Sequence, residues 1–400
     1  MKTKLLICML ALSGIANAQW QQTNFPISGG GVTCIAFRDT NIFVGSWNNG
    51  LFLSTNDGVS WTWLHNGLPN LVTALAISDT NIFAGTWGLG IFLSTNNGTS
   101  WNAVDTTFST SAGVSSLAIS DTNIFAGTGG NGVYFSNNNG AIWTAVNTGL
   151  TTWINTLLVN GTNIYAGTES GSAVYVSANN GISWTALPSF FCCVNGLVKN
   201  GTNIVAGTIA DGMFLSTNNG SSWLEVNSGL PKVNVTTVVA IRALINNGTT
   251  LIAGTDSGVY VSSNNGTSWE VFNDGLTYPN ISVSTFGING TTIFAGIGGT
   301  VWKRPLSEME SGINEINVDN SMTIFPNPFS TQTTLHADKI LKYATLSVYN
   351  SFGQEIKQIK NISGQTITFH RDILPSGLYF IRLTQDNKTI ATDKLIIIDK

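Results

Sequence analysis

The sequence predicts an all-β protein, in which a seven-bladed β-propeller with four-stranded blades is followed by a small C-terminal β-sandwich. An internal repeat of about forty residues predicts the propeller, because one four-stranded blade needs about that length of chain. A change of composition after Arg304 predicts the separate second domain. The expected divisions are residues 1–18, the propeller at 19–305, a connector at 306–321 and the C-terminal domain at 322–400.

Two short elements mark the repeat. The first reads Asn-Ile-Phe-Ala-Gly-Thr, and its glycine recurs at Gly45, Gly85, Gly127, Gly167, Gly207, Gly254 and Gly296. The second, which we call the box, reads Ser-x-Asn-x-Gly-x-Ser-Trp. Its six copies contain Asn56, Gly58 and Trp61; Asn96, Gly98 and Trp101; Asn138, Gly140 and Trp143; Asn179, Gly181 and Trp184; Asn218, Gly220 and Trp223; and Asn264, Gly266 and Trp269. Seven copies of the first element predict seven blades.

Each unit contains four segments that are rich in β-branched and aromatic residues, with Gly, Asn, Asp or Ser between them. In the second unit these segments are Val72–Ile77, Asn81–Thr86, Ile91–Ser94 and Trp101–Val104. The first segments of the seven units begin near Thr33, Val72, Val114, Ile154, Val194, Val238 and Val283. The apolar residues do not recur at the helical period, so the pattern does not favour a helical solenoid.

The last unit stops after its third segment, at Thr300–Lys303, and has no box of its own. A fourth strand is available at the other end of the domain, where Trp20-Gln21-Gln22-Thr23 resembles Trp143-Thr144-Ala145-Val146. We therefore predict that this N-terminal strand completes the last blade and closes the ring. Closure would also remove the exposed sheet edges that an open array leaves.

Residues 1–18 have the pattern of a secretory signal peptide. Lys2 and Lys4 precede an apolar run at 5–15, and Ala16-Asn17-Ala18 resembles a cleavage site. The apolar run is too short to span a bilayer, and no later stretch is long enough, so we expect no transmembrane anchor. The mature protein is expected to begin near Gln19, outside the cytoplasm.

The composition argues against several classes of function. Residues 19–304 contain six basic and eleven acidic residues, a net charge of about −5, which disfavours a nucleic-acid partner. His65 is the only histidine of the propeller, so we expect no multi-histidine metal site, and no phosphate loop or dinucleotide fingerprint indicates a cofactor. Cys34, Cys192 and Cys193 are too few for a disulfide framework; the last two either bond to each other or are buried as small apolar side chains.

The C-terminal segment opens with Phe325-Pro326-Asn327-Pro328-Phe329, continues with alternating strand-like segments and Leu374-Pro375-Ser376-Gly377-Leu378-Tyr379, and closes with Lys394–Ile398. As a set, these features over 322–400 resemble the type A C-terminal sorting domain of the type IX secretion system. The resemblance implies that the type IX secretion machinery is a partner, and that the protein is secreted or displayed on the outer cell surface of a Gram-negative bacterium. An accessory sandwich that binds sugar is the alternative.

The box is similar to the Asp-box, or bacterial neuraminidase repeat, Ser-x-Asp-x-Gly-x-Thr-Trp. That repeat is found in sialidases, sortilin-type receptors, xyloglucan-cleaving glycosidases and a family of photosystem assembly factors. Every copy here has Asn at the acidic position, and Asn also accepts backbone hydrogen bonds in a turn. We interpret the boxes as structural turns whose tryptophans pack between blades, and an ion or sugar site is the alternative interpretation.

The face opposite the boxes is the expected functional face. We call it the rim: its loops join the second segment to the third and each unit to the next, and they differ between copies. They carry the candidate binding residues Trp47, Trp87, Trp153, Glu169, Phe190, Phe191, Asp211, Asp256 and Tyr278. Aromatic faces stack on ligands and carboxylates accept hydroxyl or amide hydrogens, so the rim is predicted to bind a glycan or a protein. Alternatively, these side chains only pack on neighbouring loops.

A catalytic function is less favoured than binding. A sialidase-like site needs three arginines, whereas the propeller has only Arg38, Arg242 and Arg304, and Arg38 is expected on the box face. A secreted carbohydrate-active hydrolase that uses two of the carboxylates Glu169, Asp211 and Asp256 is the alternative to a non-catalytic binding module.

Overall fold

The computed structural model describes residues 19–26, 30–105, 113–150, 153–170, 173–189, 193–234, 237–277, 281–310, 322–350, 355–385 and 388–399. The chain divides into two compact units, residues 1–310 and 311–400. The predicted signal peptide and residues 311–321 of the connector lie outside the described residues.

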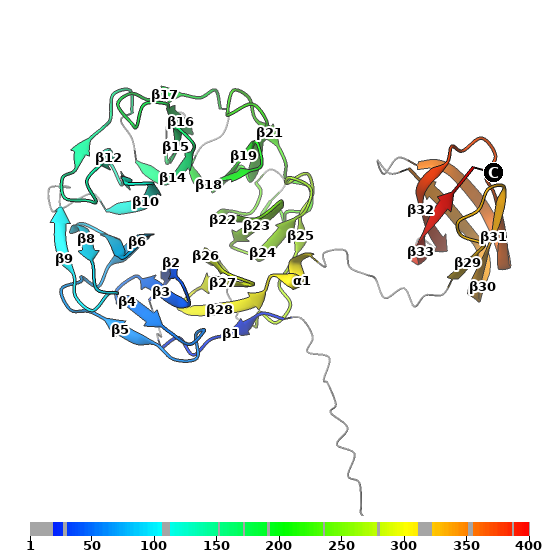
Figure 1. Cartoon of the computed structure of the whole chain (residues 1–400), viewed down its shortest axis with the longest axis horizontal. Helices are drawn as coiled ribbons and strands as arrows, with labels where there is room; N and C mark the ends of the chain where they lie inside the picture. The colour runs from blue at the N-terminus through cyan, green and yellow to red at the C-terminus, as the bar shows by residue number, and fades with distance from the viewer. Residues whose placement is uncertain are drawn as a thin grey trace, which may run out of the picture. The chain divides into compact units, whose positions relative to one another are not determined.

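The first unit is a ring of seven four-stranded antiparallel sheets (Figure 1). Blades 1 to 3 contain β2 (Val32–Arg38), β3 (Asn41–Ser46), β4 (Gly50–Ser54) and β5 (Thr62–Leu64); β6 (Val72–Ser78), β7 (Asn81–Thr86), β8 (Gly90–Ser94) and β9 (Asn102–Asp105); and β10 (Val114–Ser120), β11 (Asn123–Thr128), β12 (Gly132–Ser136) and β13 (Thr144–Ala145). Blades 4 and 5 contain β14 (Ile154–Asn160), β15 (Asn163–Thr168), β16 (Val174–Ser177) and β17 (Thr185–Ala186); and β18 (Val194–Asn200), β19 (Asn203–Thr208), β20 (Met213–Ser216) and β21 (Leu224–Glu225). Blades 6 and 7 contain β22 (Ile241–Asn247), β23 (Thr250–Thr255), β24 (Gly258–Ser262) and β25 (Glu270–Val271); and β26 (Val283–Asn289), β27 (Thr292–Ile297), β28 (Thr300–Pro305) and β1 (Gln21–Gln22). The predicted seven-bladed propeller is confirmed.

The sixth blade departs from the prediction at its first strand. β22 begins at Ile241, whereas the sequence pattern placed its start near Val238. Val238 instead forms an isolated bridge with Lys232, and the Val239 N–H donates to the Pro231 carbonyl at 2.9 Å. These bonds fold the longer inter-blade segment back on itself and delay the strand.

Closure of the ring by the N-terminal strand is confirmed. β1 pairs antiparallel with β28, with Gln21 opposite Lys303. The Trp20 N–H donates to the Asp274 carbonyl at 2.8 Å, and its indole Nε1–H donates to the Phe272 carbonyl at 2.7 Å. Trp269, a box tryptophan, makes the matching bonds to Ser228 and Val226, each at 2.8 Å. Trp20 therefore takes the place of the box tryptophan that blade 7 lacks.

Each box forms a hydrogen-bonded turn. In the first box, the Gly58 N–H donates to Ser54 Oγ at 2.9 Å, and the Ser60 N–H donates to Asn56 Oδ1 at 2.9 Å. Asn56 Nδ2 also donates to Ser60 Oγ at 2.8 Å, a bond that an aspartate in this position does not make. Four further boxes repeat all three bonds, and the third has Ile142 in place of the serine hydroxyl. In these five boxes the Asn side chain thus accepts a hydrogen bond at Oδ1 and donates one from Nδ2.

The box tryptophans lie against the preceding blade. Trp101 is 4% exposed and belongs to a cluster with Phe43 and Leu51 of blade 1. Trp223 packs in the same manner against Tyr165 and Val174 of blade 4. Because each blade supplies one such wedge to its neighbour, most of the core lies between the sheets rather than at the centre of the ring.

The propeller unit extends beyond the sequence-based boundary at residue 305. A short helix, α1 (Ser307–Glu310), follows β28 directly. Leu306 and Met309 are buried in the same cluster as Trp20, and Arg304 Nε contacts Glu308 Oε2 at 2.7 Å. Residues 306–310, which the sequence assigned to the connector, therefore belong to the propeller.

The second unit is a five-stranded antiparallel domain made of β29 (Met322–Phe325), β30 (Gln332–Tyr349), β31 (Glu355–His370), β32 (Gly377–Gln385) and β33 (Lys388–Ile397). The long β30 pairs with β29 and β31 at one end and with β31 and β32 at the other. Its pairing with β31 shifts register several times, which lets the sheet bend. Both ends of the bent sheet share one core, in which Leu335, Leu346 and Phe369 are fully buried.

Candidate functional site

The first strand of each blade, its inner strand, carries one irregularity at the rim. The register with the second strand shifts after the first strand residue, so the next residue is a β-bulge. We call these the bulge residues: Thr33, Thr73, Ser115, Asn155, Asn195, Arg242 and Ser284. Six of them line a pocket at the ring's centre, described below.

In four blades the bulge residue is a small hydroxyl that joins neighbouring blades. Thr33 Oγ1 donates to the Val72 carbonyl of the next inner strand at 2.6 Å. Thr73 bonds Val114 and Ser284 bonds Val32 in the same manner, each at 2.5 Å, and Ser115 bonds the Ile154 carbonyl. These four hydroxyl groups therefore link adjacent blades of the ring.

Blades 4 to 6 depart from this rule. Asn155 Nδ2 donates instead to Glu169 Oε2 of its own blade at 2.9 Å. Arg242 donates to both oxygens of Asp256, also in its own blade, from Nε and Nη2 at 3.0 Å each. Asn195 still reaches the next blade, at a long 3.4 Å. We call Asn155, Glu169, Asn195, Arg242 and Asp256 the polar arc.

The loop residue that follows each second strand lies beside the bulge residue of the same blade. In blades 1 to 6 its N–H donates to the carbonyl two residues before the bulge, as Glu169 does to Trp153 at 3.2 Å and Asp256 does to Ala240 at 3.3 Å. Around the ring this loop position holds Trp47, Trp87, Gly129, Glu169, Ile209, Asp256 and Gly298. This one repeat position is therefore aromatic in two blades, acidic in two others, and Gly or Ile in the rest.

Asp211 does not share that position. The sequence grouped it with Glu169 and Asp256, but Ile209 occupies the equivalent place in blade 5. The Asp211 N–H donates to Thr208 Oγ1 at 2.9 Å, and its carbonyl accepts from Asn227 Nδ2 at 3.1 Å. Its backbone thus belongs to the turn that joins β19 to β20.

Three of the predicted rim aromatics are brought together, and we call them the tryptophan row. The ring centroids of Trp47 and Trp87 are 5.6 Å apart, and those of Trp87 and Trp153 are 6.3 Å apart. Trp87 lies on Gly113, and Trp153 lies on Gly130, where an added Cβ would come within 2.7 Å of the indole nitrogen. The exposed fractions are 38%, 36% and 46% along the row, so each ring keeps an accessible surface.

The two acids of the polar arc, Glu169 and Asp256, have hydrogen-bonding partners. The guanidinium of Arg242 holds the pKa of the Asp256 carboxyl below its usual value, and the Ser282 hydroxyl, at 2.8 Å, acts in the same direction. Glu169 is held by Asn155. Among the described residues no group of three or more His, Cys, Asp or Glu is arranged to hold a metal ion.

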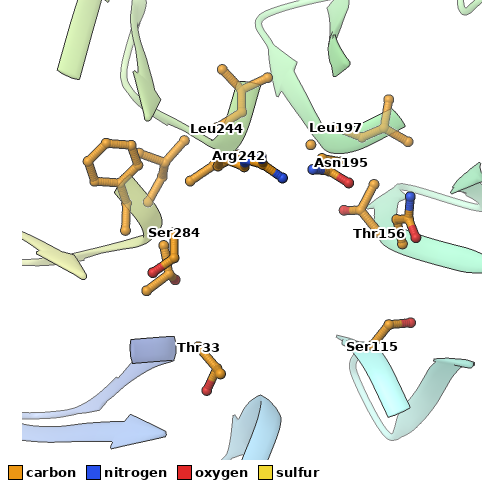
Figure 2. A pocket seen from close by; sticks show the side chains of 14 residues that line it. Thr33, Ser115, Thr156, Asn195, Leu197, Arg242, Leu244 and Ser284 are labelled. Carbon is orange, nitrogen blue, oxygen red and sulfur yellow. The ribbon is translucent and has the colours of Figure 1, made fainter. Parts of the chain in front are cut away.

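A polar pocket opens at the centre of the ring, with a volume of about 380 Å³. Figure 2 shows the side chains of Thr33, Ser115, Asn195, Arg242 and Ser284 arranged around an open centre. Further along the inner strands the lining combines Thr156 and Thr285 with Leu197, Leu244 and Phe286. The pocket therefore offers both polar groups and apolar side chains to a ligand.

Other predicted residues have different outcomes. Phe190, Phe191, Tyr278 and Cys192 lie outside the described residues, so both alternatives for Cys192 and Cys193, a mutual bond or burial as small apolar side chains, stay predictions. Cys34 in β2 is half-buried, and desolvation of its thiol raises the pKa to about 12, which disfavours the reactive thiolate.

The sequence reasoning missed Asn155, Asn195 and Arg242 as site residues. The signal was present: each stands at a repeat position that is Thr or Ser in the other blades. It could be recognised only once the register shift and the pocket lining had shown that this position faces the centre of the ring.

Residues 323–398 match the secretion system C-terminal sorting domain family. The protein is therefore an exported β-propeller, secreted or on the cell surface, with a C-terminal domain that directs it to the type IX secretion system. In the described part of the chain, no helix has the length and apolar character that a membrane span requires. A search of curated protein sequences finds no match.

Solved structures share the propeller fold at low sequence identity. A GH74 xyloglucanase from Xanthomonas campestris is 17% identical with a TM-score of 0.59, and the match covers 73% of this chain and 54% of that one. PorZ, a surface component of the type IX secretion system of Porphyromonas gingivalis, is 13% identical with a TM-score of 0.52, covering 91% and 59%. YCF48 from Cyanidioschyzon merolae is 13% identical with a TM-score of 0.57, covering 73% and 99%. This chain thus spans little more than half of the first two proteins, and at these identities the likeness concerns the fold alone.

Proposed function

We propose that this protein is a non-catalytic binding module, which acts outside the cell and presents the propeller rim to a glycan or a protein. The observation that carries the proposal is the contrast between the two faces. The boxes repeat the same turn around the ring, whereas a single rim position holds Trp47, Trp87, Glu169 and Asp256 in different blades. Side chains that the scaffold does not require are the ones available for recognition.

Binding is better supported than hydrolysis. A glycosidase needs one carboxyl group with a raised pKa to act as the acid, and a second carboxylate beside it. Here the pKa of Asp256 is lowered by Arg242, and Glu169 is bonded to an amide. Asp211 occupies a different loop position from these two acids, so the three do not form a repeated constellation.

The proposed export route uses both ends of the chain. The signal peptide at 1–18 would take the protein across the inner membrane, and the sorting domain would engage the type IX secretion machinery at the outer membrane. The mature binding module would then begin near Gln19.

The test is binding of the purified full-length protein to a glycan array and to a panel of extracellular proteins. Trp87→Ala removes the central member of the tryptophan row, and we expect it to weaken binding of any true ligand about tenfold, the loss of roughly one aromatic contact. Trp63→Ala is the matched control, because Trp63 is 47% exposed but stacks on His65 instead of the row. Equal affinity of the two variants for every detected ligand would show that the rim is not the binding surface. Release of reducing sugar from the bound glycans would favour the hydrolase instead.

A further inference from the structure

The tryptophan row and the polar arc lie on different blades of the same rim, and Asn155, Asn195 and Arg242 of the arc line the central pocket. The row comes from blades 1 and 2 and from the segment that leads into blade 4, and Trp153 covers blade 3 by lying on Gly130. The polar arc belongs to blades 4 to 6. From this division we infer that the pocket receives the terminal sugars of a short neutral glycan, end-on. The inference rests on the proposed function and specifies its ligand.

The chemistry of the two arcs fits a sugar ring. A pyranose has an apolar C–H face, which packs on an indole, and hydroxyl groups around its edge, which both donate and accept hydrogen bonds. The polar arc supplies amides at Asn155 and Asn195, carboxylates at Glu169 and Asp256, and the Arg242 guanidinium. Amides, carboxylates and a guanidinium together offer both donors and acceptors to such hydroxyls. Thr33, Ser115 and Ser284 complete the lining, although their hydroxyl protons are already donated to neighbouring blades.

The charges favour a neutral ligand over an acidic one. Among the described residues that line the pocket, Arg242 is the only cation, and its bidentate bond to Asp256 compensates its charge. Glu169 adds a carboxylate beside Asn155, so the arc carries a net negative charge. A uronate, a phosphate or a sulfate would bring a further negative charge to an arc whose guanidinium is already paired with Asp256, which is unfavourable.

The size of the pocket and the tilt of the tryptophans favour end-on entry of a short ligand. A volume of about 380 Å³ lies near the lower limit for small-molecule sites. Neighbouring indoles are inclined by 58° and 74°, so they do not form a flat track along which consecutive sugars of a long chain could stack. One exposed indole face can still hold one sugar at the mouth.

The experiment is calorimetric titration of the full-length protein with cello-, xylo- and manno-oligosaccharides, from the monosaccharide to the hexasaccharide, and with oligogalacturonates of the same lengths. We expect at least one neutral series to bind, with an affinity that stops rising at the di- or trisaccharide, and the uronate series to bind about tenfold more weakly or not at all. For a bound series, the parent polysaccharide should compete in proportion to its number of chain ends rather than its mass.

Two variants assign that binding to the pocket. Trp153→Ala and Asn195→Ala should each weaken it about tenfold, from loss of a stacking face or of an amide contact. Trp63→Ala and Asn102→Ala are the controls, since both residues are exposed outer-strand positions of the same chemistry, and they should bind as the natural chain does.

Different failures separate this inference from the proposed function. If the rim variants abolish binding of a protein or an acidic glycan, the rim is a binding surface but the neutral-glycan inference is overturned. An affinity that keeps rising to the hexasaccharide overturns end-on recognition, and so does the absence of binding by every neutral series. If a neutral glycan binds and the rim variants leave its affinity unchanged, both the inference and the proposed rim site are wrong.

Discussion

Arg242 and Asp256 form an ion pair that the ring does not need. The equivalent side chains in blades 1, 2, 3 and 7 are hydroxyls that join adjacent blades, whereas this pair stays within blade 6. Both side chains are about 40% exposed, at 41% and 40%, so solvent screens much of their attraction. The pair is therefore better suited to presenting hydrogen-bonding groups at the rim than to stabilising the fold.

Replacing Arg242 should consequently have a small effect on stability. We expect Arg242→Gln to lower the free energy of unfolding at neutral pH by at most about 1 kcal/mol. The folded-state pKa of Asp256 is lowered by Arg242, so the pair stabilises the fold above the ordinary aspartate pKa, and this contribution is lost as the pH falls through the folded value. Urea denaturation of both proteins at neutral and at strongly acidic pH measures the difference. If the difference in unfolding free energy between the two proteins grew as the pH fell, this assignment of the charges would be wrong.

At the scale of a single turn, the two serines of each box have unequal roles. Ser216 is fully buried, and its Oγ accepts the Gly220 N–H at 2.7 Å. Ser222 is near the surface, and its Oγ accepts from Asn218 Nδ2 at 2.8 Å. In the third box Ile142 replaces the second serine without loss of the turn, which indicates that this hydroxyl is dispensable.

The two serines should therefore differ in their response to alanine. We expect Ser216→Ala to lower the free energy of unfolding by about 1–3 kcal/mol, because it leaves a buried backbone N–H without its acceptor. Ser222→Ala should lower it by less than about 1 kcal/mol, because water can replace the lost bond. Thermal unfolding of the two variants in parallel gives the comparison, and equal losses would show that burial of the Gly220 N–H is not the deciding factor.

The elements of the fold could be read from the sequence more completely than the site could. Because the sequence pattern of each strand recurs in seven units, the predicted strands of blade 2 agree with the structure within one or two residues. The predicted start of β22 is wrong because an extra turn interrupts the pattern there. Trp47, Trp87 and Trp153 were identified because aromatics on variable loops stand out in a repeat. Asn155 and Arg242 were not identified. Strand alternation predicts which face of the sheet a side chain lies on only where the register is regular, and the β-bulge interrupts the register at these residues.

Over the whole propeller, the box turns are nearly the same in every copy, whereas the residues at the centre of the ring differ between blades. Blade-to-blade hydroxyl bonds run from blade 7 through blades 1, 2 and 3, whereas the polar arc replaces or weakens them in blades 4 to 6. The ring tolerates this loss because the tryptophan wedges, such as Trp223 and Trp269, still fill the spaces between those blades. The integrity of the ring thus depends on the wedges, and a functional site can be built at the centre.

The seventh wedge, Trp20, makes this argument testable, because it is the only one supplied from outside its own repeat unit. Trp20 is 2% exposed and makes the same two backbone hydrogen bonds as Trp269. Trp20→Ala should therefore lower the free energy of unfolding by about 3–5 kcal/mol, as Trp269→Ala should, through loss of a fully buried indole. Deletion of residues 19–24 should lower the melting temperature further, because it also exposes the edge of β28. Trp63→Ala, at a 47% exposed site, controls for loss of an indole as such and should leave the melting temperature nearly unchanged. If the deletion variant melted at the same temperature as the intact chain, the N-terminal strand would not be what holds the ring closed.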